Sequence, residues 1–146
     1  MSDKLRVLVL CTGNSARSQM AEGILRHDAG DRFAVFSAGS RPSQVRPEAV
    51  QVMAEIGVDI SGQRSKHHDQ FAGQAFDYVV TVCDQARESC PVFPGVRQQF
   101  HWSIADPAAV EGDERQRLAA FRIARDELRR VLRNFGMYAQ ALQRPE

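Results

Sequence analysis

The chain has 146 residues, of which 43% are hydrophobic and 25% are charged, a length and composition typical of one globular domain with its own core. Its 19 basic and 18 acidic residues leave a formal net charge of +1, so no overall positive field attracts nucleic acid or an anionic membrane. We therefore expect a single domain over residues 1–146, with neither a nucleic-acid nor a membrane partner.

The first predicted element is a strand over residues 5–10, a run rich in leucine and valine that suits the interior of a parallel sheet. This run is too short for the core of a signal peptide or for a membrane span, so we expect a cytoplasmic protein. Residues 18–26 follow with apolar side chains at helical spacing, and Gly30 closes that helix. The segment between strand and helix is short and polar.

The same alternation of strand and helix continues along the chain. The remaining predicted elements are a strand over 33–37, a helix over 47–56, a strand over 76–82, a strand near 96–100 and a helix from about 113 to 135 or beyond. Such alternation indicates parallel pairing and hence an α/β fold. Residues 61–73 and 83–95 resemble loops. Arginines on the last helix alternate with acidic residues, which is typical of a solvated face.

The segment between the first strand and the first helix carries the strongest chemical signal. It reads Cys11, Thr12, Gly13, Asn14, Ser15, Ala16, Arg17 and Ser18. A short loop of small and polar residues can turn successive backbone N–H groups inward, and the following helix adds its positive end. We therefore predict an oxyanion-binding loop formed by Thr12, Gly13, Asn14, Ser15, Ala16, Arg17 and Ser18.

Two side chains of this loop suggest catalysis. The planar guanidinium of Arg17 can hold two oxygens of a phosphate or arsenate. Cys11 is the candidate nucleophile. Because a helix N-terminus and a guanidinium lower a thiol pKa to ~3.5–7.5, we expect Cys11 to be a thiolate that Ser18 hydrogen-bonds. The alternative is an inert core cysteine in an ordinary strand-to-helix turn.

Three cysteines, Cys11, Cys83 and Cys90, fit a disulfide framework poorly because the number is odd and the cytosol keeps thiols reduced. Cys83 follows a strand that is predicted to lie parallel to the strand before Cys11, and parallel strand ends converge on one face. We therefore expect the two thiols to meet. Two buried structural thiols remain the alternative, and the spacing matches no common zinc pattern.

With these motifs the sequence resembles the low-molecular-weight protein tyrosine phosphatase fold family, and within it the thioredoxin-coupled arsenate reductases. The matching segments are residues 9–15, 20–23, 37–39, 82–83, 90–91, 101–102 and 106–107. The resemblance implies a single-domain α/β fold, with a four-stranded parallel sheet flanked by helices. It also implies that Asp106, which precedes Pro107, is a general acid. Aromatic residues follow this pair in the tyrosine phosphatases, whereas Ala108 follows it here.

The resemblance implies a reaction in which Cys11 attacks arsenate and Cys83 then attacks Cys11, which releases arsenite. Cys90 next attacks Cys83, and thioredoxin reduces the resulting disulfide. Seven residues of α-helix span roughly 10 Å, whereas a disulfide joins Cα atoms about 4.4–6.8 Å apart. We therefore expect any helix between Cys83 and Cys90 to unwind on oxidation.

Some reductases of this kind bind potassium beside the loop, at positions that match Asn14, Glu22 and Ser37. Lys66 occupies the place of an aspartate, and our hypothesis is that its ammonium replaces the ion by pairing with Glu22 and holding Asn14.

We expect the protein to bind no metal and no cofactor and to be a monomer. Phosphate or sulfate should mimic arsenate as a ligand. A small phosphatase and a non-catalytic oxyanion binder or redox sensor remain alternative functions.

Overall fold

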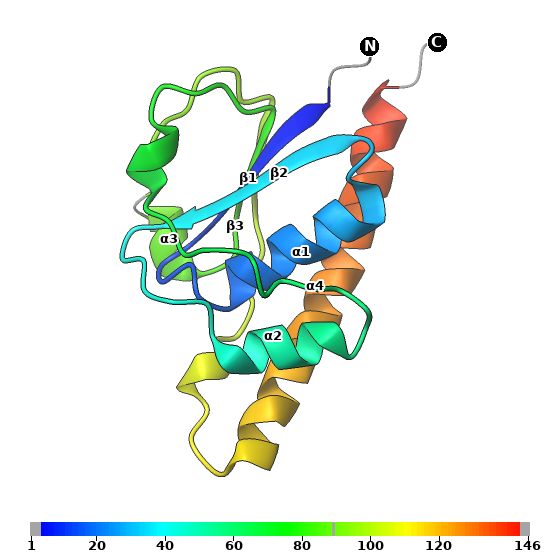
Figure 1. Cartoon of the computed structure of the whole chain (residues 1–146). Coiled ribbons are helices and arrows are strands. Elements are labelled where there is room, and N and C mark those ends of the chain that lie inside the picture. The colour runs from blue at the N-terminus through cyan, green and yellow to red at the C-terminus, as the bar shows by residue number, and fades with distance from the viewer. Residues whose placement is uncertain (1–3, 89, 144–146) are drawn as a thin grey trace.

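A computed structural model describes residues 4–88 and 90–143. Its centre is a four-stranded sheet in the order β2-β1-β3-β4, in which all neighbours are parallel (Figure 1). The strands are β1 (Leu5–Cys11), β2 (Phe33–Gly39), β3 (Tyr78–Thr81) and β4 (Gln98–His101). The predicted α/β fold with a parallel sheet is thus confirmed. The apolar run of β1 places it in the interior, where Val7, Leu8 and Val9 are fully buried.

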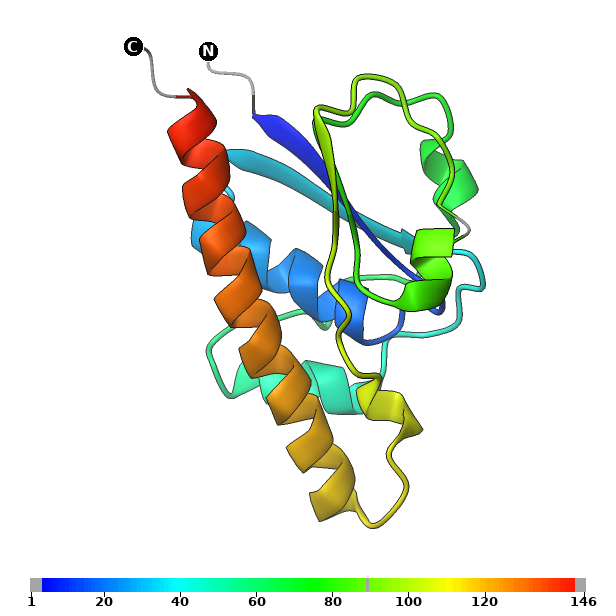
Figure 2. The ribbon, with the colours of Figure 1, turned by 180° about the vertical axis from the view of Figure 1, so that it is seen from behind.

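Within residues 4–88 and 90–143, four α-helices and two short 3₁₀ helices accompany the sheet. They are α1 (Arg17–Ala29), α2 (Pro47–Ala54), α3 (Asp84–Glu88), α4 (Glu114–Gln143), η1 (His68–Phe71) and η2 (Pro107–Ala109). Figures 1 and 2 show α1, α2 and α4 packed together, whereas α3 lies at the end of the sheet opposite the two termini. That end is where β1 and β3 stop, so residues that follow both strands gather there.

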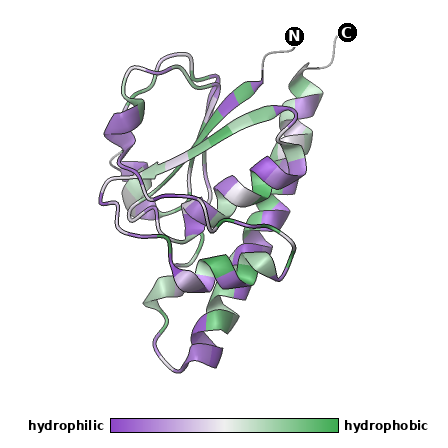
Figure 3. Ribbon diagram, in the orientation of Figure 1, coloured by the Kyte–Doolittle hydropathy of each residue, from purple (hydrophilic) through white to green (hydrophobic). Residues whose placement is uncertain are grey.

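Helix α4 continues to Gln143, which agrees with the prediction of a helix that reaches residue 135 or beyond. Its apolar face is buried through Leu118, Phe121, Leu128, Leu132 and Phe135, as the spacing predicts. Its other face carries exposed arginines, and Figure 3 shows the two kinds of residue alternating along the helix. Within the part of the chain that the structure describes, no helix combines the length and apolarity needed to cross a membrane.

Two predicted loops contain short helices. Helix α3 lies in the segment 83–95, and η1 lies in the segment 61–73. Neither helix is long enough for its apolar residues to show a helical repeat in the sequence. In η1, the imidazole of His67 accepts the backbone N–H of Asp69 and so caps the helix.

Candidate oxyanion and thiol site

The loop after β1 has its carbonyl groups turned outward. The carbonyl oxygens of Thr12, Gly13 and Ser15 accept backbone N–H groups of residues 41, 43 and 46 at 2.9, 3.2 and 2.8 Å. Among the described residues, the backbone N–H groups of residues 13–17 have no partner in the protein. With the carbonyl groups bonded on the outside, these N–H groups are left to form the inner ring that an oxyanion needs.

Asn14 fixes the shape of this loop from within. Its backbone has φ 46°, a left-handed conformation that asparagine tolerates better than most residues. The side chain is fully buried, and its amide donates to Ser18 Oγ at 2.8 Å and to Ser37 Oγ at 3.0 Å. The amide oxygen accepts from Gln19 Nε2 and from the backbone N–H of Lys66, both at 2.9 Å. Ser18 therefore supports Asn14, and the expectation that its hydroxyl contacts the Cys11 sulfur is wrong.

A pocket of about 450 Å³ opens above the loop. Its walls are Cys11, Thr12, Gly13, Ser15, Ala16, Arg17, Ser43, Arg46, Cys83, Asp84, Asp106 and Ala108. The predicted nucleophile, arginine and acid thus share one pocket with Cys83. Ser43, Arg46 and Asp84 were missed in the sequence because no motif marks them, although Asp84 directly follows Cys83.

Arg17 reaches across the pocket to the segment after β4. Its guanidinium donates to the carbonyl oxygen of Ile104 at 2.8 Å and lies 3.7 Å from an Asp106 carboxylate oxygen. The second Asp106 oxygen accepts the backbone N–H of Ala108 at 3.0 Å. These contacts hold the arginine and the acid at the mouth of the same pocket.

Cys11 and Cys83 are buried thiols that line the same pocket, and each shifts the pKa of the other. The hydrogen bond with Cys83 and the burial of the sulfur raise the pKa of Cys11, and Arg17 opposes this only in part. The same hydrogen bond, together with Thr12 Oγ1 at 3.2 Å, lowers the pKa of Cys83 to about 5. In the reduced protein the negative charge therefore lies on Cys83, and Cys11 carries the proton.

This charge distribution corrects the expectation that Cys11 is the resting thiolate. That expectation counted the helix N-terminus and Arg17, which do act on the loop, but it left out the second thiol. A thiolate inside a protein is stabilised by each donor that points at it. Cys83 has two such side-chain donors, Thr12 and the thiol of Cys11 itself.

Cys90 lies outside this main pocket. It is half-buried, and burial raises the pKa of its thiol. A second, much smaller cavity contacts both Cys90 and Cys11, together with Ala86 of α3. The three cysteines therefore cluster at one end of the sheet, with Cys11 next to both cavities.

The four residues of the potassium hypothesis also come together. Glu22 accepts a hydrogen bond from Ser37 Oγ, and its carboxylate lies 2.6 Å from Arg26 and 3.8 Å from Lys66 Nζ. The Lys66 ammonium donates to the carbonyl of Arg64 at 2.7 Å, and only its backbone N–H holds Asn14. Two cations already neutralise one buried carboxylate, so the residues present do not fit an added potassium ion.

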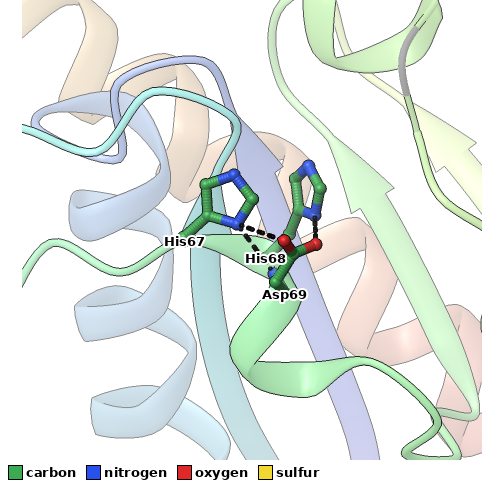
Figure 4. A group of neighbouring side chains, drawn as sticks. All are labelled: His67, His68 and Asp69. Atoms are coloured by element: carbon green, nitrogen blue, oxygen red, sulfur yellow. Dashed lines mark hydrogen bonds and ion pairs between the residues drawn. The ribbon is translucent and has the colours of Figure 1, made fainter.

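Another group of possible metal ligands lies at the start of η1, where His67, His68 and Asp69 offer ligand atoms within 4.8 Å of one another (Figure 4). In this structure the three side chains contact one another. The carboxylate lies 3.4 Å from His67 Nδ1 and 3.3 Å from His68 Nδ1. The spacing of the histidines in the sequence did not suggest this grouping, because the 3₁₀ turn brings the three neighbours to one side.

Comparison with known proteins agrees with this geometry. Residues 6–145 match the model of the family described as low molecular weight phosphotyrosine protein phosphatase. The chain is 44% identical over 134 residues to an arsenate reductase of Halalkalibacterium halodurans, covering 92% of this chain and 96% of the relative. A solved arsenate reductase in a phosphate-binding state is similar with a TM-score of 0.74 and 32% identity, over 90% of this chain and 95% of that one.

A thioredoxin-dependent arsenate reductase of Corynebacterium glutamicum is similar at a TM-score of 0.76 and 29% identity. That match covers 97% of this chain and 65% of the larger protein. Family match, overall sequence identity and fold all agree. The chain therefore belongs to the low molecular weight phosphotyrosine protein phosphatase family, and within this family it is similar to arsenate reductases.

Proposed function

We propose that this protein reduces arsenate to arsenite and that thioredoxin restores its thiols. The observation that carries the proposal is the pair of buried thiols, Cys11 and Cys83, in one pocket next to a ring of free backbone N–H groups. A hydrolytic phosphatase needs the ring and one thiol. A second thiol in contact with the first supplies the two electrons that convert As(V) to As(III).

In the proposed reaction, the N–H groups of residues 13–17 and the Arg17 guanidinium hold three oxygens of arsenate. Cys11 attacks arsenic, and one oxygen leaves as water after it receives the Cys11 proton, with Asp106 next to it as an acid. The Cys83 thiolate then attacks Cys11 Sγ. The sulfur–arsenic bond breaks, its electron pair stays on arsenic, and arsenite leaves a Cys11–Cys83 disulfide.

The location of the resting charge on Cys83 favours this sequence. Cys11 can give its proton to the leaving oxygen, and Cys83 is already ionised for the second step. Cys90 then attacks Cys83 and transfers the disulfide to the protein surface, where thioredoxin reduces it. Helix α3 occupies residues 84–88 between the two cysteines, so the Cys83–Cys90 bond requires that it unwind.

The pocket wall favours reduction of a small anion over hydrolysis of an aryl phosphate. Ala108 stands where the tyrosine phosphatases carry aromatic residues, and the pocket lining also includes Ser43 and Arg46. Among the described residues the lining has no aromatic side chain on which a phenol ring could stack. We also propose that the Lys66 ammonium takes the place of potassium, so that turnover is independent of this ion, and that a single chain is sufficient for catalysis.

The test compares arsenite formation with thioredoxin in the wild type and in the Cys83→Ser and Cys90→Ser variants. We expect turnover in the wild type and its loss in both variants, whereas any hydrolysis of p-nitrophenyl phosphate persists in both because it needs only Cys11. Ser89→Ala is the matched control. Formation of more than one arsenite per chain without thioredoxin, or full turnover in either variant, would contradict the proposal.

A further inference from the structure

Each peptide unit of the oxyanion loop carries a carbonyl group and an N–H group that point in opposite directions, because the peptide bond is planar and trans. An N–H group therefore faces the anion only if the carbonyl oxygen of the preceding residue is held outward. Backbone N–H groups hold the carbonyl oxygens of Thr12, Gly13, Ser15 and Ala16. Within residues 4–88 and 90–143, no backbone N–H group bonds to the carbonyl oxygen of Asn14, so this one depends on a side chain.

Gln19, in the first turn of α1, supplies the missing donor. Its side chain is fully buried, and Nε2 donates to the carbonyl oxygen of Asn14 at 3.0 Å and to the side-chain oxygen of Asn14 at 2.9 Å. The carbonyl oxygen of Arg64 also lies 2.9 Å from this nitrogen. Because all three neighbours are acceptors, only an NH₂ group fits at this point.

The orientation of the Gln19 amide is fixed from its other side. Gln63 Nε2 donates to Gln19 Oε1 at 2.7 Å and to the carbonyl oxygen of Gln19 at 3.0 Å. An exchanged amide would place an oxygen against three acceptors and a donor against a donor. The Gln19 nitrogen is therefore directed at the loop.

The conformation of Asn14 makes this support necessary. Its φ of 46° lies in the left-handed region, which is unfavourable for a residue with a Cβ atom. Its carbonyl group is buried, and without Gln19 it would lack a partner unless the peptide plane turned over. Such a turn would move the N–H group of Ser15 away from the pocket that Ser15 lines.

We propose that Gln19 is a positioning residue of the oxyanion loop, which directs the N–H group of Ser15 at the bound anion through the carbonyl group of Asn14. The inference rests on the proposed function, in which this anion is arsenate. Gln19 is fully buried and is not among the residues that line the pocket, so it acts on the anion only through Asn14.

The test replaces Gln19 by methionine, which has a similar length and no hydrogen-bond donor. In the reduced wild type, titration with inorganic phosphate should shift the amide NMR resonances of Gly13, Ser15 and Ala16. In Gln19→Met we expect the Ser15 shift to be largely lost, whereas Gly13 and Ala16 still respond because backbone donors hold their peptide units. The Kd for phosphate should rise about 10-fold, as expected for the loss of one hydrogen bond to a charged group.

Two further variants complete the experiment. Gln51→Met is the matched control, because it makes the same substitution at an exposed glutamine of α2, and it should leave the Ser15 shift and the Kd unchanged. Gln63→Met leaves Gln19 in place but removes the donor to Gln19 Oε1, so the Kd should rise less, about 3-fold. Resonances of β4 and α4 should be unchanged in every variant.

A Ser15 response as large as that of the wild type, in Gln19→Met or, should that variant not fold, in Gln63→Met, would overturn the inference. An equal weakening at Gly13, Ser15 and Ala16 would also overturn it, since that indicates a merely structural role, and so would a wild type without a Ser15 response. Phosphate is bound and not reduced, so the result does not depend on turnover. Failure of the proposed function would appear instead as a wild type that binds phosphate and forms no arsenite.

Discussion

Arg17 and Arg46 border the same pocket but differ in what holds them. Arg17 is mostly buried and bonded to Ile104, with Asp106 nearby, whereas Arg46 is exposed and its guanidinium has no partner among the described residues. The backbone of Arg46 is nevertheless fixed by its bond to Ser15 of the loop. Arg46 is thus a second cation at the entrance, free to meet an incoming anion.

Replacing this residue by Arg46→Gln should raise the KM for arsenate about 10-fold and leave kcat nearly unchanged, because an exposed charge assists binding more than chemistry. The effect should weaken in added salt, which screens exposed charges. Initial rates at several ionic strengths measure it. Arg41→Gln, an exposed neighbour outside the pocket, is the control, and an equal effect there would contradict a specific role for Arg46.

The charge on Cys83 can be tested through its reactivity. Its pKa is lowered to about 5, so the thiolate is present above that pH and is lost as pH falls through it. In the reduced wild type, limited iodoacetamide should modify Cys83 before Cys11. The rate should stay level from about pH 8 to pH 6 and fall to half near pH 5. Peptide mapping that finds Cys11 modified first would contradict this assignment.

At the scale of elements, the end of β2 must come very close to the oxyanion loop. A Cβ atom on Gly39 would lie 2.4 Å from the carbonyl oxygen of Thr12 and 2.6 Å from that of Cys11. Both are backbone atoms of the loop, so neither can move without distorting it. Glycine at the end of this strand is therefore required by packing.

Gly39→Ala should accordingly destabilise the fold by about 1–3 kcal/mol, the usual range for overpacking, and weaken phosphate binding at the loop. Urea unfolding and titration calorimetry measure the two effects. Gly62→Ala is the control, because its added Cβ meets no atom within 4 Å. Unchanged phosphate binding in Gly39→Ala would show that the loop tolerates the displacement.

The parts of the site that could be predicted are those encoded locally. The apolar run of β1, the cysteine and arginine of the loop, and the helix after it are contiguous, and parallel strand ends then bring Cys83 to Cys11. Arg46 could not be assigned because a tertiary hydrogen bond positions it. The protonation state of Cys11 was predicted wrongly because it depends on Cys83, a residue that is far away in the sequence.

At the scale of the whole molecule, ion pairs connect α2 to the long helix α4. Glu55, next to the end of α2, accepts from Arg122 at 2.7 Å and from Arg125 at 2.9 Å. Arg125 also donates to the carbonyl of Val52 at 2.8 Å. The hydrogen bond from Arg122 is the main reason that the pKa of Glu55 is lowered to about 2.

Because the pKa of Glu55 is lower in the folded protein than in the unfolded chain, its stabilising effect is present above about pH 4.5 and is lost as pH falls toward 2. Glu55→Gln should lower Tm slightly at pH 7, and the difference from the wild type should vanish near pH 2. Thermal melts across this range measure it. An equal shift in the exposed control Glu111→Gln would indicate a general charge effect instead.

In the proposed reaction, two thiols of one chain supply the two electrons that reduce arsenate. Its most direct test is a single turnover without any reductant, in which arsenite, free thiols and disulfides are counted together. We expect one arsenite per chain, together with the loss of two thiols and the formation of one disulfide that includes Cys83. Arsenite without loss of thiols, or arsenate bound and released unchanged while all three thiols persist, would contradict it.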